Sequence, residues 1–384
     1  MDALELLDLI QMGESSKVQF KIRINNANAV GAEMVAFSNT KGGMIIVGVD
    51  DKTGDINGLS FEEIAETNQL LANAASNNIK APIYIYTETV KIKEHHVVVA
   101  HISEGMSKPH MDNNGTIWVK NGSDKRKVVS KEEIARLLQS SGNLYADETI
   151  VSGTTIHDID EAYFQKFILT KTKKTIEQLG QSTAMILSNL GMLKDGKISL
   201  GGLLLFGKNP QQFRPMFTVQ CVSVVGNEIS SKAFRDKEDP FTGNLEELYD
   251  KTLSFITRNL KKVQKKDGFN SRPELEVPME TIEELLVNAL MHRDYFIASS
   301  IKVFIFDNRI EIISPGKLPN TLTIENIKIG TSIPRNPILF TNARFVLPFV
   351  GVGSGIPRAF ENSPDLELIN DTDRELFISI IKRP

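Results

Sequence analysis

The last third of the chain contains three segments whose order constrains the fold more than any other feature of the sequence. Residues 282–292 place apolar side chains at helical spacing, with polar side chains along the edge of the apolar face. An extended segment then ends at Ser314-Pro-Gly316, and the run Gly351-Val-Gly353-Ser-Gly355 follows before further helical sequence. We therefore expect an α/β domain in which a helix, a strand end and a glycine-rich loop meet at one cleft.

The polar edge of the helix carries residues that could bind a metal ion or activate water. Glu284, Asn288 and His292 follow one another at intervals of one helical turn. An amide oxygen suits Mg²⁺, which prefers oxygen ligands, and a carboxylate can orient or deprotonate a water molecule. An ordinary amphipathic helix with a solvated edge explains the same pattern and stays open as an alternative. We expect His292 to pack or to form hydrogen bonds rather than to act as a base.

The glycine run adds the second half of a candidate site. Glycines let backbone N–H groups approach a phosphate closely, and the N-terminus of the helix that follows favours anions. A flexible connector is the alternative for the glycine run taken alone. Because the sequence contains no G-x-x-x-x-G-K-[ST] motif, a nucleotide pocket here is built without a P-loop. The candidate catalytic residue is Glu284, the candidate magnesium ligand is Asn288, and the candidate residues for binding ATP are Asn288, Ser314, Gly316, Gly351, Gly353 and Gly355.

Residues 278–361 resemble the GHKL-like ATPase module of bacterial proteins that join it to a Schlafen AlbA-type domain. Some members of this divergent AAA-4 family carry the labels RecG-like helicase or transcriptional regulator. The resemblance rests on Asn288-Ala, His292-Arg-Asp294, Ser314-Pro-Gly316-Lys-Leu-Pro319, Arg335-Asn-Pro337 and Gly353-Ser-Gly355-Ile. It implies an α/β sandwich that binds ATP and magnesium. In wider GHKL ATPases an aspartate accepts a hydrogen bond from the adenine amino group, and the neutral Ser314 stands at that position as a weaker acceptor.

A basic segment lies in the N-terminal third. Residues 116–120 alternate as a strand, Asn121-Gly122 is a strong turn signal, and a run of three cations follows. Cations beside a tryptophan on a hairpin suit phosphate contacts combined with base stacking. A solvated charged loop is the alternative. The candidate residues for nucleic-acid binding are Trp118, Lys120, Lys125, Arg126 and Lys127.

Residues 12–140 are similar to the Schlafen AlbA-type domain. The similarity rests on Phe20-Lys21, Ala36-Phe37-Ser-Asn39-Thr, Gly42-Gly43 and Gly48-Val-Asp50-Asp51-Lys. It implies an α/β domain that binds nucleic acid and that, in some relatives, cleaves RNA with a metal held by three carboxylates. That cluster corresponds to Glu14, Gln19 and one of Asp50 or Asp51, with Gln19 in place of the usual glutamate. One missing charge weakens attraction for a dication, so we do not expect nuclease activity, whereas phosphate contacts do not depend on the acids.

Length favours two or three domains, and composition favours a cytoplasmic protein. With the two resemblances, we expect a nucleic-acid-binding domain at 1–142, a helical and mixed connecting domain at 143–270, and the ATPase-type domain at 271–384. A single cysteine fits a reducing cytoplasm, and the longest apolar runs are too short to cross a membrane. The net charge of −4 gives no overall attraction for nucleic acid, so binding requires a local basic surface.

Three functions are compatible with these observations. The first is a DNA-binding transcriptional regulator whose GHKL-like module senses a nucleotide, with DNA preferred to RNA as its partner. The second is a slow magnesium-dependent ATPase that acts with nucleic acid in defence or repair. The third is a scaffold in which both sites have decayed, as Gln19 and Ser314 permit. The GHKL resemblance is also compatible with a homodimer.

Overall fold

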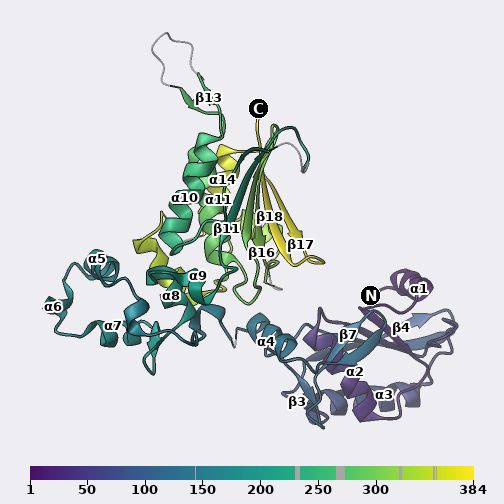
Figure 1. Ribbon diagram of the computed structural model, residues 1–384. Coiled ribbons are helices and arrows are strands. Elements are labelled where there is room, and N and C mark those ends of the chain that lie inside the picture. Colours follow the sequence, from purple (N-terminus) through teal and green to yellow (C-terminus); the bar gives the residue numbers. More distant parts are fainter. Residues whose placement is uncertain (143, 230–233, 265–272, 320–321, 349–350, 352) are drawn as a thin grey trace. The chain divides into compact units, whose positions relative to one another are not determined.

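A computed structural model describes residues 1–142, 144–229, 234–264, 273–319, 322–348, 351 and 353–384 (Figure 1). The chain divides into two compact units, Met1–Leu144 and Tyr145–Pro384. Both units combine helices with β-sheets, which confirms the expected α/β class. The segment expected to form a connecting domain, 143–270, falls almost entirely within the second unit. That residues 143–270 form a domain distinct from residues 271–384 stays a prediction.

The first unit is built on a four-stranded sheet with strand order β1-β2-β5-β4. The first two strands in this order are parallel and the other neighbours are antiparallel. Because side chains alternate across β2, Ile45 and Val47 lie on the face that packs against α2 and α3, while Ile46 lies on the face that packs against α1. The elements are α1 (Ala3–Met12), β1 (Val18–Lys21), α2 (Ala27–Asn39), β2 (Gly43–Val47), α3 (Phe61–Asn77), β4 (Ile85–Ile92) and β5 (His95–Ile102).

Helices α2 and α3 cover one face of this sheet, and α1 packs on the other through Leu6 and Ile10. A short pair, β3 (Ile79–Lys80) and β6 (Met111–Asp112), lies beside α2 and α3. The expected hairpin is present as β7 (Trp118–Asn121) and β8 (Asp124–Lys127), with Gly122 at positive φ in its turn. The final helix, α4 (Lys131–Ser140), begins after Ser130, whose hydroxyl accepts a hydrogen bond from the Glu133 backbone N–H at 3.1 Å.

The second unit contains a six-stranded sheet with strand order β12-β11-β15-β16-β18-β17. Its neighbours are antiparallel except for β11 and β15, which are parallel. The strands are β11 (Val219–Val224), β12 (Phe234–Lys237), β15 (Ile301–Ile305), β16 (Arg309–Pro315), β17 (Glu367–Asp371) and β18 (Leu376–Lys382).

Three helices cover one face of the six-stranded sheet: α10 (Leu245–Arg258), α11 (Met279–His292) and α14 (Gly355–Asn362) (Figure 1). The predicted apolar face of α11 is buried, since Ile282, Leu285 and Leu286 are each no more than 1% exposed. Burial of this face against the sheet leaves the polar edge of α11 at the border of the core.

Apart from the short strand Lys262–Val263, the remaining elements of the second unit contribute side chains to the hydrophobic core of the sheet. They are η1 (Ala146–Glu148), η2 (Ile156–Asp158), α5 (Glu161–Thr172), α6 (Ile176–Leu179), α7 (Thr183–Asn189), β9 (Leu193–Lys194), β10 (Lys197–Ile198), α8 (Leu200–Phe206), α9 (Pro210–Phe213), β13 (Lys262–Val263), β14 (Glu274–Leu275), α12 (Ile324–Lys328), α13 (Pro337–Asn342) and η3 (Ala343–Phe345). Throughout the described ranges, every helix is too short or too polar to cross a bilayer.

A buried ion pair between Arg383, which follows β18, and Glu276 lies at the end of the six-stranded sheet. Arg383 Nη2 lies 2.7 Å from Glu276 Oε1, and both side chains are only 2% exposed. The same carboxylate oxygen accepts a hydrogen bond from the Lys261 backbone N–H at 2.8 Å, and Arg383 also donates to the Phe306 carbonyl. Removing one partner of such a pair leaves an uncompensated charge inside the protein.

We predict that Arg383→Met lowers the free energy of unfolding of the second unit by about 3–5 kcal/mol. The double variant Arg383→Met/Glu276→Met recovers part of this loss, because it leaves no unpaired charge. Urea unfolding followed by circular dichroism reports both units, whereas fluorescence of Trp118, the single tryptophan, reports the first unit alone. An Arg383→Met protein with an unchanged circular dichroism transition contradicts the prediction.

Candidate functional site

A cavity of about 120 Å³ lies in the second unit where α11, the end of β16 and the start of α14 converge. Its lining includes every residue that the sequence indicated for the nucleotide site. These are Glu284, Asn288, Ser314, Gly316, Gly351, Gly353 and Gly355. The fold therefore joins residues that lie up to 71 positions apart in the chain into one pocket.

The side chains on the polar edge of α11 bind each other. Asn288 Nδ2 donates to the carbonyl oxygen of Glu284 at 2.8 Å and to its Oε1 at 2.7 Å. Because the amide nitrogen is turned toward Glu284, the amide oxygen is turned away from it, and this oxygen is the atom that a hard cation would take. Within the parts of the chain that the structure describes, no three His, Cys, Asp or Glu side chains are grouped to hold a metal. A magnesium ion bound to Asn288 would therefore complete its coordination with phosphate oxygens and water.

His292 lies one turn further along the same edge, and its ring packs against Phe340 with 6.2 Å between ring centroids. Burial, with a smaller effect of the positive charge on Arg335, lowers the pKa of His292 to about 4. The imidazole is therefore neutral near pH 7, in line with the packing role that we expected for it.

Ser314 is the last residue but one of β16, lines the pocket and is 5% exposed. Its Oγ donates to the carbonyl oxygen of Ala289 in α11 at 3.2 Å, so the hydroxyl proton is engaged and lone pairs remain to accept a hydrogen bond. Gly316 follows with φ of +102°, and a Cβ built there would lie 2.5 Å from the Cβ of Asp294. Glycine is required at this turn for both reasons.

The glycine-rich loop is shaped by close approaches within the protein. Gly351 and Gly353 have positive φ, and a Cβ at Gly353 would lie 2.1 Å from the carbonyl oxygen of Gly330. Gly355 is the first residue of α14, and a Cβ there would lie 1.7 Å from Glu284 Oε1. These glycines let the loop pass between Gly330 and α11, which brings the N-terminus of α14 to the pocket.

Sequence reasoning missed the cations and most of the apolar wall of the pocket. Lys317, Arg335 and Arg358 line the cavity, and Arg335 Nη2 donates to the Lys317 carbonyl oxygen at 2.6 Å. Burial lowers the pKa of the Arg335 guanidinium. Apolar lining comes from Leu318, Leu322, Ile327, Ile333, Phe340 and Phe377. Most of these residues lie in loops or short helices without a periodic pattern, although the two runs that carry the resemblance, residues 314–319 and 335–337, contain Lys317, Leu318 and Arg335.

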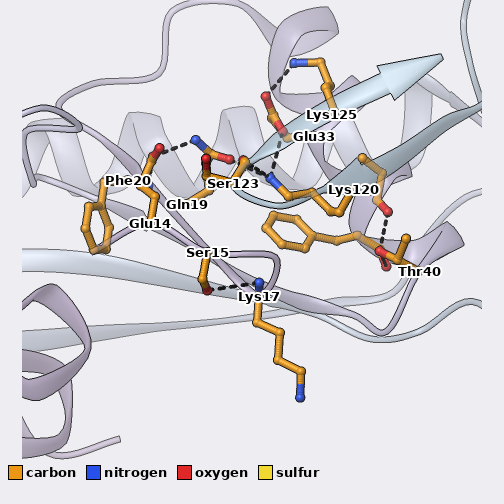
Figure 2. A network of polar contacts seen from close by, with 12 residues as sticks. Glu14, Ser15, Lys17, Gln19, Phe20, Glu33, Thr40, Lys120, Ser123 and Lys125 are labelled. Carbon is orange, nitrogen blue, oxygen red and sulfur yellow. Dashed lines mark hydrogen bonds and ion pairs between the residues drawn. The ribbon is translucent and has the colours of Figure 1, made fainter. Parts of the chain in front are cut away.

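In the first unit, two lysines of the basic hairpin, Lys120 and Lys125, lie beside Glu33 of α2 (Figure 2). Lys120 is only 1% exposed, and its Nζ donates to Gln19 Oε1 at 2.8 Å and to the Ser123 carbonyl oxygen, with Glu33 Oε2 4.0 Å away. Burial lowers the pKa of the Lys120 ammonium, against the opposing influence of the nearby Glu33 and Glu14 carboxylates. This arrangement differs from our expectation that Lys120 contacts nucleic acid, because its charge is used inside the domain.

The other hairpin candidates are held by contacts of the domain itself. The Nζ atoms of Lys125 and Lys127 lie 5.6 Å and 5.4 Å from the centre of the Trp118 ring, within cation–π distance. Trp118 Nε1 donates to Asp112 Oδ2 at 2.8 Å. Lys125 also pairs with Glu33, while Arg126 pairs with Glu133 on α4 and remains 46% exposed. Lys127 is exposed. The accessible positive charge of this hairpin therefore comes from Arg126 and Lys127.

The positions that correspond to a carboxylate cluster are engaged in local hydrogen bonds. Gln19 Nε2 and the Phe20 backbone N–H donate to Glu14 Oε1 at 2.6 Å and 2.8 Å (Figure 2). Asp50 Oδ1 accepts from the backbone N–H groups of Thr53 and Lys52, which lower the pKa of this carboxyl group. Glu14 therefore orders the start of β1, and Asp50 orders its own turn.

Comparison with known families assigns both ends of the chain. Residues 14–129 match the family described as "Schlafen, AlbA_2", and residues 298–375 match the family described as "Putative ATP-dependent DNA helicase recG C-terminal". The second match contains Ser314, Gly316 and the glycine-rich loop, whereas Glu284 and Asn288 precede it. Together, the two matched domains indicate a DNA-binding protein with an ATP-related C-terminal domain. No curated protein matches the chain at a significant level.

Solved structures are also similar to the chain, and two of them serve as examples. The DIP2311 protein from Corynebacterium diphtheriae is 19% identical over 99% of this chain and 80% of its own, with a TM-score of 0.45. The N-terminal domain of a Putative ATP-dependent DNA Helicase RecG-related Protein from Nitrosomonas europaea is 21% identical, with a TM-score of 0.26. This similarity covers 34% of the present chain and 96% of the domain. The two family matches confirm the expected pairing of a Schlafen AlbA_2 domain with a RecG-related C-terminal domain in this chain.

Proposed function

We propose that the protein is a DNA-binding transcriptional regulator that binds a nucleotide, ATP with magnesium, in the pocket of its C-terminal unit. The observation that carries this proposal is the convergence of α11, the β16 turn and the glycine-rich loop on one cavity. Each of the three contributes residues that suit a different part of a nucleotide.

The two kinds of lining in the pocket suit the two ends of a nucleotide. Apolar side chains such as Ile312, Leu318 and Phe377 suit a base, which is largely buried when bound. The N-terminus of α14, together with Lys317 and Arg358, suits phosphate groups. Ser314 Oγ offers an acceptor for a base amino group, because its proton is directed to the Ala289 carbonyl oxygen.

Isothermal titration of ATP tests the nucleotide site. We expect saturable binding that magnesium strengthens, and we expect Asn288→Ala to lose at least about tenfold in magnesium-dependent affinity because the amide oxygen is removed. Asn362→Ala, at the exposed end of α14, is the matched control and should bind as the parent does. If the parent protein itself does not bind ATP, the pocket is inactive and the scaffold hypothesis is favoured.

The hairpin of the first unit is the proposed contact for nucleic acid, now limited to Trp118, Lys125, Arg126 and Lys127. Because Lys125 and Arg126 also pair with acids of the domain, charge reversal would disturb the fold, and neutral substitutions are the better test. Contacts between cations and phosphates release counterions, so affinity must fall as salt is raised.

We predict that Arg126→Gln/Lys127→Gln weakens binding to duplex DNA and reduces the slope of log K against log[salt] by about 1.8, that is, by about 0.9 for each lost phosphate contact. Fluorescence anisotropy at several KCl concentrations measures the slope, with duplex RNA as the second ligand. Lys91→Gln removes an exposed charge elsewhere in the same unit and serves as control. An unchanged slope in the double variant excludes this hairpin as the contact surface.

A slow ATPase is the second candidate, favoured by the carboxylate of Glu284 beside the proposed magnesium ligand. If Glu284 activates water, Glu284→Gln should abolish phosphate release while nucleotide binding persists, because the amide cannot accept the proton. A coupled phosphate-release assay with ATP and magnesium measures turnover. Absence of release by the parent protein, with ATP binding intact, rejects hydrolysis and leaves the nucleotide-sensing function.

A further inference from the structure

The carboxylate of Glu284 lies against the first turn of α14. A Cβ built on Gly355 would lie 1.7 Å from Glu284 Oε1 and 2.4 Å from Oε2, so the carboxylate occupies the space beside the Gly355 Cα. On its other side, Oε1 accepts a hydrogen bond from Asn288 Nδ2 at 2.7 Å. The carboxyl group is thus enclosed between α11 and α14 and is 18% exposed.

The surroundings of this carboxylate are those of an anion-binding site. The first turn of a helix has backbone N–H groups without partners in the helix, and it carries partial positive charge. Ser354, which precedes Gly355, makes no side-chain capping hydrogen bond to α14. Arg358 Nη2 from the same turn lies 3.7 Å from Glu284 Oε2. The first turn of α14 and the Arg358 guanidinium therefore both lie close to the Glu284 carboxylate.

A phosphate group would use the same two features. In the proposed nucleotide site, the N-terminus of α14 and Arg358 are the natural partners of the phosphates, and both line the cavity. Glu284 already provides a negative charge at that position. A phosphate bound in the cavity between Arg358 and the N-terminus of α14 would meet this carboxylate, and two like charges in a partly buried site repel each other.

We propose that Glu284 is an internal competitor of the phosphate groups, occupying their position at the N-terminus of α14 and Arg358 until a nucleotide displaces it. This inference rests on the proposed nucleotide binding. Displacement of the carboxylate frees Arg358 for a phosphate oxygen and releases the Asn288 amide from its hydrogen bond with Oε1. Glu284 therefore weakens binding of ligands that carry phosphate and leaves binding of the base and sugar unaffected.

The test compares three ligands on three proteins. Glu284→Gln keeps the size of the side chain and an acceptor for the Asn288 amide, but removes the charge. We expect it to bind ATP and pyrophosphate about tenfold more tightly than the parent protein, as one removed like charge at short range allows. Adenosine, which carries no phosphate, should bind both proteins equally. Isothermal titration with magnesium held constant gives each affinity.

Glu280→Gln is the matched control, because it removes one negative charge from an exposed position of the same helix. It should leave the affinities for all three ligands unchanged. Equal tightening by Glu280→Gln indicates a general effect of net charge and overturns the proposal, as does a Glu284→Gln protein that binds ATP no more tightly than the parent.

The outcomes separate this inference from the proposed function. If neither the parent nor Glu284→Gln binds any of the ligands, nucleotide binding itself fails. If the parent binds ATP and Glu284→Gln binds ATP and adenosine more tightly by the same factor, the site is real, but Glu284 does not compete with phosphate. Thermal unfolding of each variant confirms that the second unit stays folded during the titrations.

Discussion

The C-terminal end of α11 is the constraint on which the rest of the second unit depends. The last carbonyl groups of a helix have no partners within it and must be satisfied from outside when they are buried. Here Ser314 Oγ donates to the Ala289 carbonyl oxygen at 3.2 Å, and Tyr295 Oη donates to that of Leu290 at 2.8 Å. Asn336 Nδ2 donates to the carbonyl oxygens of Met291 and Arg293 at 2.9 Å and 3.0 Å. Side chains from three separate segments therefore hold this helix end, and one of them, Ser314, also lines the pocket.

This arrangement explains why conspicuous polar motifs are structural as well as functional. Asn336 is 1% exposed and cannot reach a ligand without leaving α11. Arg293 is 2% exposed, donates to the Ile297 carbonyl oxygen at 3.2 Å, and stacks between Phe217 and Tyr295. The partners of these side chains offset part of the cost of burial, while Asn336 Oδ1 and Arg293 Nε have no hydrogen-bond partner among the described residues. Asn336 and Arg293 thus hold the end of α11 in place without lining the pocket.

The sequence predicted those parts of the fold and site that follow from a local period. The face of α11 was predictable because apolar residues recur every three to four positions, and the hairpin was predictable from Asn121-Gly122 between alternating segments. The buried environment of Lys120 could not be predicted in this way. In the hairpin register Lys120 pairs with Lys125 and Trp118 with Lys127, so all four share one face. That this face meets Glu33 of α2 depends on tertiary packing, which no local period records.

The two units use charge in opposite ways around their candidate sites. In the first, the ammonium of Lys120 is enclosed by Gln19, the Ser123 carbonyl oxygen and Glu33, so a cation of the protein satisfies a group of oxygens. In the second, the carboxylate of Glu284 lies against the first turn of α14 and 3.7 Å from the guanidinium of Arg358. A charge that is 1% exposed has lost nearly all of its hydration, whereas one that is 18% exposed keeps a path to water. Lys120 is therefore a fixed part of its domain, while Glu284 is the charge that a ligand can replace.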